Sequence, residues 1–232
     1  MRAISQIWRS SPTYKVTKLI EFAPGTNDSR RARLLARLAE AARAPEVVRS
    51  VVNCSLPGNQ NGGDLIWHVQ YPDRAAYDRS LTSSAWRDVE GLLADASVAG
   101  EESVGYEAGP IGVRQPDLSA GIFRVLLLKV LDGTPQAIVE RFEAELQAMP
   151  RYISSIRNWQ LSRVADSSGA RPWTHVWEQE YEDVSGLHGP YMRHPYHWGY
   201  IDRWFHPESP DQIVDTYLCQ CFCRFENGVI RG

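Results

Sequence analysis

The sequence predicts an α+β fold in which two ferredoxin-like β-α-β-β-α-β repeats face each other and form an intramolecular dimeric α+β barrel. The first observation is that the same order of strand and helix patterns occurs twice, with an offset of roughly 105 to 110 residues. The second is that matching turn signals, Pro24-Gly25-Thr26 and Asp132-Gly133-Thr134, follow the first strand of each copy. The third is that such a unit covers only one face of its sheet with helices, so a second copy is needed to bury the other face.

The first repeat is expected over residues 12–109, from alternating apolar residues and helix caps. Asn27 or Asp28 suits the start of the first helix, and Pro45 ends the helical pattern. The glycine-rich stretch 58–63 reads as a hairpin loop. The strands expected in this repeat are 14–22, 47–56, 65–71 and 102–108, and the helices are 28–43 and 74–96.

Residues 110–119 are expected to form a connector, and the second repeat follows over 120–226. Pro150 is expected to stop its first helix, and 166–169 reads as a loop. The strands expected in this repeat are 122–131, 153–164, 173–181 and 212–225, with helices at 135–149 and around 191–205. The short sequence around His68 is expected to mirror the one around His175.

Composition and charge exclude several classes of function. The formal net charge of −3 is spread over both halves, so no basic stripe points to nucleic acid. The longest apolar runs, such as 125–128, are too short to cross a membrane, and 1–10 does not resemble a secretion signal. We expect a cytoplasmic protein. No phosphate-binding glycine loop or dinucleotide fingerprint occurs, so no cofactor is expected.

Three of the four cysteines, Cys219, Cys221 and Cys223, alternate along the last expected strand. They would point to one face, with neighbours ~7 Å apart. That arrangement suits small core residues better than a disulfide or a zinc knuckle.

The candidate site lies in residues 191–197, which read Tyr-Met-Arg-His-Pro-Tyr-His. Pro195 biases His194 away from helical angles, so one helix should end there and another should begin at the proline. Tyr191 at the end of the first helix and His197 at the start of the second can then meet. A neutral imidazole accepts a proton near pH 7 and a phenol donates a hydrogen bond, so the two suit acid/base chemistry.

The second half resembles the stress-responsive dimeric α/β barrel (Dabb) family. The resemblance rests on Val-Leu-Leu-Leu-Lys at 125–129, Trp-Thr-His-Val at 173–176 and the Tyr-x-x-His-Pro-x-His string. A plant cyclase of that family has the same string and performs an aldol cyclisation without metal or cofactor. The resemblance therefore implies that Tyr191 and His197 are the acid/base pair.

Further roles are implied by the same resemblance. His175 matches a pocket histidine, Asp215 matches an aspartate that orients the imidazole of His197, and Arg124 replaces a histidine on the first strand. An arginine there suits an anion rather than a proton transfer. The remaining substrate-binding residues expected on these elements are Leu126, Leu128, Trp177, His194 and Ile201.

The leading hypothesis is a cofactor-independent lyase or cyclase that makes or breaks a carbon–carbon bond in a small aromatic molecule held in the barrel. Two alternatives are a non-catalytic barrel protein that oligomerises or binds a ligand, and a cofactor-free monooxygenase. A metal site built from the histidines of 188–206 is less favoured, because the proline breaks their helical spacing. Two such chains are expected to be able to form a homodimer.

Overall fold

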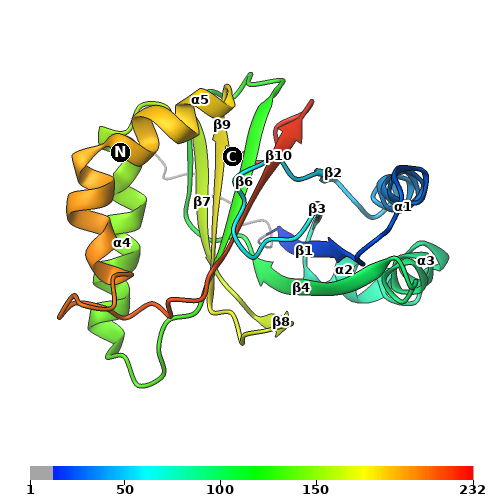
Figure 1. Cartoon of the computed structure of the whole chain (residues 1–232), viewed down its shortest axis with the longest axis horizontal. Helices are drawn as coiled ribbons and strands as arrows, with labels where there is room; N and C mark the ends of the chain where they lie inside the picture. The colour runs from blue at the N-terminus through cyan, green and yellow to red at the C-terminus, as the bar shows by residue number, and fades with distance from the viewer. Residues whose placement is uncertain (1–12, 232) are drawn as a thin grey trace, which may run out of the picture.

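The computed structural model describes residues 13–231, and its elements form four layers (Figure 1). Helices α1 to α3 lie on the outer side of one five-stranded sheet, the two sheets face each other in the middle, and α4 with the segment after α5 covers the other sheet. The mixed α+β fold with two antiparallel sheets confirms the expected fold class.

The first sheet has the strand order β2-β3-β1-β4-β8, and the second has the order β10-β6-β9-β7-β5. The strands of the first half are β1 (Tyr14–Phe22), β2 (Arg49–Cys54), β3 (Leu65–Tyr71) and β4 (Val98–Glu107). Those that follow are β5 (Ile111–Val113), β6 (Gly121–Leu128), β7 (Asn158–Arg163), β8 (Asp166–Ser168), β9 (His175–Tyr181) and β10 (Cys219–Phe225). All the pairings within both sheets are antiparallel.

The helices of the first half are α1 (Asp28–Ala41), α2 (Arg74–Ser80) and α3 (Ser84–Leu93). The single helix expected at 74–96 is therefore two, because the side chain of Ser83 accepts a hydrogen bond from the Trp86 N–H and caps a new start. The second half has α4 (Gln136–Tyr152), α5 (Val184–Gly186), the π-helices η1 (Leu187–Tyr191) and η2 (Tyr196–Ile201), and the 3₁₀-helix η3 (Asp202–Trp204).

Two short strands cross between the halves, where the sequence predicted a connector and a loop. β5 comes from 110–119 and pairs with β7 of the second sheet, whereas β8 pairs with β4 of the first sheet. Asp166 holds β8 in place, since it accepts hydrogen bonds from the Tyr14 hydroxyl at 2.7 Å and the Arg74 guanidinium at 2.6 Å. The connector thus adds an edge strand to the second sheet, and the second half adds one to the first sheet.

Two further element ends differ from expectation. α4 runs through Pro150 to Tyr152, so this proline does not end the helix although it cannot donate a helical hydrogen bond. The last strand begins at Cys219 rather than near 212, and only Val214 forms an isolated bridge, to Val130, before it.

The space between the sheets is filled by side chains from both halves. Cys219, Cys221 and Cys223 are fully buried there, as expected for small core residues. His68 also points into this space, where its ring lies 5.0 Å from that of Phe123. His175 instead faces α4, so the expected mirror between the two histidines is wrong: an odd shift in strand register turns a side chain to the opposite face.

Candidate active site

The interruption of the helix at His194 and Pro195 positions the candidate site. Regular helical structure stops at His194 and resumes at Pro195, as the proline predicted. The Nδ1 atom of His194 accepts a hydrogen bond from the Tyr196 N–H at 3.1 Å, which places His194 at the turn rather than at the site. Both flanking segments are π-helices, a winding that often occurs at functional sites.

Tyr191 and His197 meet across this turn. Their ring centroids are 4.5 Å apart, and Tyr191 is 2% exposed. Both rings lie on the helix-covered face of the second sheet, not between the two sheets as the barrel hypothesis expected. The candidate site therefore belongs to one sheet and its own helices.

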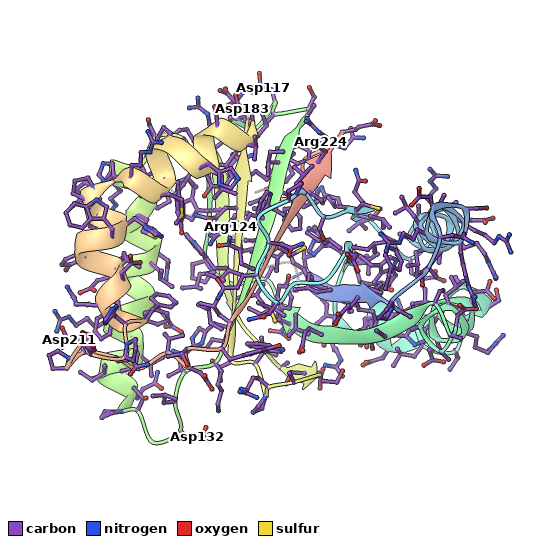
Figure 2. All side chains as sticks on the ribbon, viewed as in Figure 1. Asp117, Arg124, Asp132, Asp183, Asp211 and Arg224 are labelled. Carbon is purple, nitrogen blue, oxygen red and sulfur yellow. The ribbon has the colours of Figure 1, made fainter. Side chains whose placement is uncertain are left out.

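Arg124 lies on β6 of the second sheet (Figure 2) and contacts this pair through Tyr191. Its guanidinium donates hydrogen bonds to the side-chain oxygens of Gln179 and Gln220 and to the Tyr191 hydroxyl, the last at 3.2 Å. The guanidinium carbon also lies 5.0 Å from the centroid of the Tyr191 ring. Arg124 is 3% exposed, and among residues 13–231 no carboxylate lies within 4 Å of it.

A buried guanidinium that has only neutral partners is costly, because removing a cation from water is normally offset by an anion. Arginine keeps its charge in proteins, so it cannot escape this cost by losing a proton. The cluster is therefore electrostatically suited to an anionic group.

The environment of His197 keeps its imidazole neutral. Burial, and then the positive charge of Arg124, lower the pKa of His197 to about 4. The carboxylate nearest to it is that of Asp202, with Oδ1 3.9 Å from Nδ1, which is beyond hydrogen-bond distance. At neutral pH the ring is thus an unprotonated base.

Several buried polar atoms around this cluster have no hydrogen-bond partner among the described residues. They are Arg124 Nε, Trp177 Nε1, Gln179 Nε2, Tyr181 Oη and His197 Nδ1. Buried polar atoms normally have hydrogen-bond partners. A group of such atoms without partners on one sheet face therefore indicates a place where polar atoms of a ligand fit.

Asp215 does not orient His197. It lies in the loop before β10, where its Oδ1 accepts the Tyr217 N–H at 2.9 Å and its Oδ2 is 3.4 Å from Arg171 Nε. The sequence placed Asp215 on the last strand, and the later start of β10 is the reason for the difference.

His175 belongs to a separate group at the other end of β9. Its Nε2 is 2.9 Å from Glu143 Oε1 and its Nδ1 is 2.8 Å from Thr174 Oγ1, so both ring nitrogens have partners. It pairs with Leu128 in the strand register while Gln179 pairs with Arg124, a separation of about 13 Å along the strand. His175 therefore lies outside the cluster around Arg124.

The expected apolar residues of the site are all found on this face. Leu126, Leu128, Trp177 and Ile201 are buried in one cluster with Tyr191 and the inner side of α4. They form the apolar surroundings that exclude water from the polar group at Arg124.

Three residues of the site were not predicted from the sequence: Gln179, Gln220 and Asp202. The alternation along β9 does put Gln179 on the face of Trp177, which was a usable signal. Asp202 is five residues after His197, and only the wider winding of a π-helix brings it close. Within residues 13–231, no group of three or more His, Cys, Asp or Glu side chains has the arrangement of a metal site.

The arrangement can bind an anion, donate a hydrogen bond to it and accept a proton beside it. Arg124 supplies the charge, Tyr191 the hydroxyl and His197 the base. Together these are the parts needed to form and stabilise an enolate or phenolate.

Comparisons with known proteins agree with this fold. Residues 122–215 match the family model of the stress responsive A/B barrel domain. No curated protein matches the chain by sequence. In the part of the chain that the structure covers, no helix is long and apolar enough to cross a membrane.

Solved structures resemble the whole chain at low sequence identity. An anthrone oxidase-like protein has a TM-score of 0.66 at 8% identity, with 94% of this chain and 92% of that chain covered. A proposed monooxygenase from Lactobacillus acidophilus NCFM has a TM-score of 0.57 at 11% identity, covering 96% and 100%. A mutant chlorite dismutase from Candidatus Nitrospira defluvii has a TM-score of 0.53 at 10% identity, covering 91% of each. Residues 122–215 therefore resemble the stress responsive A/B barrel domain, and the whole chain shares the fold of these structures.

Proposed function

We propose that the chain is a cofactor-independent acid/base enzyme, a lyase or cyclase that makes or breaks a carbon–carbon bond in a small aromatic molecule with an acidic oxygen. The observation that carries the proposal is Arg124, a buried cation with neutral partners only, beside the neutral base His197. A substrate carboxylate, phenolate or enolate supplies the missing anion.

The proposed reaction moves one proton and forms one bond. His197 takes a proton from a carbon next to a carbonyl group, and the negative charge moves to the carbonyl oxygen. Arg124 and the Tyr191 hydroxyl stabilise that oxygen. The enolate carbon then bonds to a second carbonyl carbon of the same molecule, and the resulting alkoxide takes the proton back from His197. The reverse sequence breaks the bond.

Cofactor-free monooxygenation is a second candidate. The same deprotonated carbon, in an aromatic molecule held by Arg124, can pass one electron to O₂ without a cofactor. The substrate radical and superoxide then combine to a peroxide, which takes the proton from His197 and loses water to leave a carbonyl group. The names of two structures with this fold, an anthrone oxidase-like protein and a proposed monooxygenase, raise this possibility for the chain. The two candidates share the deprotonation step and differ in whether O₂ is consumed.

A screen of enolisable phenolic ketones and keto acids, with products identified by mass spectrometry, tests the proposal. Each compound is incubated with and without O₂, with the wild-type protein, with Arg124→Met and with Arg224→Met. Arg224 is an exposed arginine on β10 and serves as the matched control.

We expect a product that forms equally well with and without O₂. The Arg124→Met variant should form it roughly 10²- to 10³-fold more slowly than the wild type, whereas the Arg224→Met variant should form it at the wild-type rate. A product that requires O₂ would select the monooxygenase. Tight binding without turnover, lost in Arg124→Met, would contradict both enzymes and identify a binding protein.

A further inference from the structure

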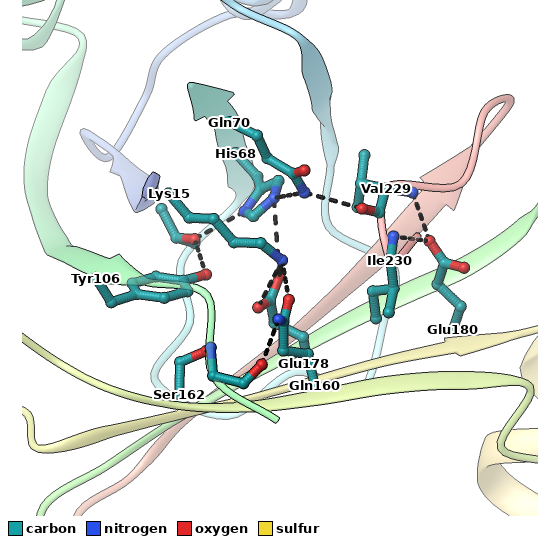
Figure 3. Close-up of polar contacts among 12 residues, drawn as sticks. Lys15, His68, Gln70, Tyr106, Gln160, Ser162, Glu178, Glu180, Val229 and Ile230 are labelled. Carbon is teal, nitrogen blue, oxygen red and sulfur yellow. Dashed lines mark hydrogen bonds and ion pairs between the residues drawn. The ribbon is translucent and has the colours of Figure 1, made fainter. Parts of the chain in front are cut away.

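A second buried polar group lies between the two sheets (Figure 3), on the opposite face of the second sheet from Arg124. Lys15 on β1 donates hydrogen bonds to the Glu178 carboxylate at 3.1 Å and to Gln160 on β7. Lys15 is 2% exposed and Glu178 is fully buried. This ion pair joins the first sheet to the second.

His68 completes the group from the first half. Its Nε2 accepts a hydrogen bond from Gln70 at 3.0 Å, so its Nδ1 carries the proton and donates to Thr17 Oγ1 at 2.9 Å. Burial, and then Lys15, lower the pKa of His68 well below its ordinary value, so the ring is neutral. The first half thus contributes the Lys15 ammonium here and the second half contributes the Glu178 carboxyl group. Burial raises the pKa of that carboxyl group, whereas the charge and hydrogen bonds of Lys15 lower it and favour the ion pair.

The contacts across this interface come in pairs related by an approximate twofold axis. In the strand registers, His68 lies opposite Thr17, and Glu178 lies opposite Val125. Lys15 precedes Thr17 by two residues, as Phe123 precedes Val125. The contact of Lys15 with Glu178 is therefore matched by that of Phe123 with His68.

The pair His68 and Glu178 lies on the axis itself, since these equivalent residues approach each other to 3.7 Å. Any pairing of two identical halves would bring two copies of the same residue together at this point. Two second halves would place Glu178 against Glu178, with Phe123 where Lys15 now lies. Two first halves would leave Lys15 facing His68 without a carboxylate.

We infer that the Lys15–Glu178 pair specifies which sheet faces which, so that the two unlike halves of one chain pair with each other and not with the same half of a second copy. Like carboxylates, or a lone ammonium, cannot be buried at the axis without a large cost. A buried polar pair at an interface is a known means of selecting a partner.

A double-mutant cycle measures the pairing in the full-length chain. Lys15→Met leaves the Glu178 carboxylate buried without its partner, and Glu178→Gln leaves the Lys15 ammonium buried without its partner. The double variant leaves no unpaired charge. We expect each single variant to lower Tm by about 10 °C and the double variant to lower it by clearly less than the sum. Lys15→Arg keeps the charge and should stay near the wild-type Tm.

Lys18 and Glu101 provide the matched control, because they form an ion pair at 3.1 Å within the first sheet only. The corresponding cycle of Lys18→Met and Glu101→Gln should show small losses. It should also leave the mass distribution of the protein unchanged.

Whether a half pairs within its own chain or with a second copy is measured by light scattering, as the molar mass of the protein after refolding from urea at high protein concentration. The Lys15→Met/Glu178→Gln variant should refold to a larger share of multi-chain species than the wild type. Additive Tm losses, or a wild-type mass distribution, would overturn the inference. If the double variant does not refold, Glu178→Gln alone gives the same test. It leaves the Lys15 ammonium unpaired in the native pairing, and it removes the repulsion between two Glu178 carboxylates when two second halves pair.

Discussion

Three histidines, the buried His68 and His175 and the partly buried His197, show how the surroundings of a side chain decide its role. In His68 and His175 both ring nitrogens have partners within hydrogen-bond distance, and these rings serve the interface and the attachment of α4. In His197 one buried nitrogen has no partner, and Arg124 lies near enough to lower its pKa. Only His197 therefore has the free lone pair that a base requires.

The acid limb of the pH–rate profile reports this base. His197 is active when neutral, so kcat/KM should stay level from pH 7 down to about pH 5 and fall as the pH drops through about 4. Arg124→Met removes the second cause of the lowered pKa, so the limb should move to higher pH, although burial still lowers it. The measurement is kcat/KM between pH 3.5 and 8 for both proteins. A limb near pH 6.5, or one that Arg124→Met leaves in place, would argue against His197.

At the scale of elements, one carboxylate on α4 binds the segment that carries His197. Glu145 on α4 accepts hydrogen bonds from Tyr200 at 3.0 Å, Arg203 at 2.6 Å and Trp204 at 2.7 Å. Arg141 on the same helix also donates to it, at 3.0 Å. The irregular π and 3₁₀ winding of 196–204 is thereby held against a regular helix.

Glu145→Gln should loosen this attachment. Because hydrogen bonds to a charged group each contribute ~1.5–3 kcal/mol, we expect a loss of about 3 kcal/mol in the free energy of unfolding, measured in urea. Turnover should also fall, since His197 loses its fixed position. Glu140→Gln, at an exposed position of the same helix, should change neither quantity. Wild-type turnover in Glu145→Gln would show that the position of η2 does not depend on this contact.

The sequence predicts the elements well and their fine geometry poorly, for physical reasons. Alternation along β9 correctly separates Trp177 and Gln179 from Glu178 and Glu180, because strand periodicity is local. The break at Pro195 is also local. The π winding that brings Asp202 toward His197 depends on the packing of 196–204 against α4, which no local pattern records.

Long-range features escaped for the same reason. β5 and β8 are three-residue strands that exist only because an edge of the opposite sheet is available to pair with them. The late start of β10, which leaves Asp215 with Arg171, is likewise set by the fold around it. The location of the site on the outer face of the second sheet follows from how the two sheets meet, and not from the repeat itself.

At the scale of the whole molecule, each sheet needs the other to bury its inner face. A fragment of residues 119–232 lacks the partner of Phe123, Val125 and the three cysteines of β10. We expect it to aggregate or to associate with itself, as measured by light scattering at several concentrations. A well-folded monomer would contradict the view that one chain forms the barrel from its two halves.

The most direct test of the central claim compares His197→Ala with His68→Ala once a substrate is in hand. Both changes remove a neutral imidazole, fully buried in His68 and partly buried in His197, but only the first removes the proposed base. We predict that kcat/KM at 25 °C falls roughly 10²- to 10⁴-fold in His197→Ala, whereas His68→Ala loses stability and keeps its turnover. Equal losses in the two variants, or full activity in His197→Ala, would contradict an acid/base site at Arg124, Tyr191 and His197.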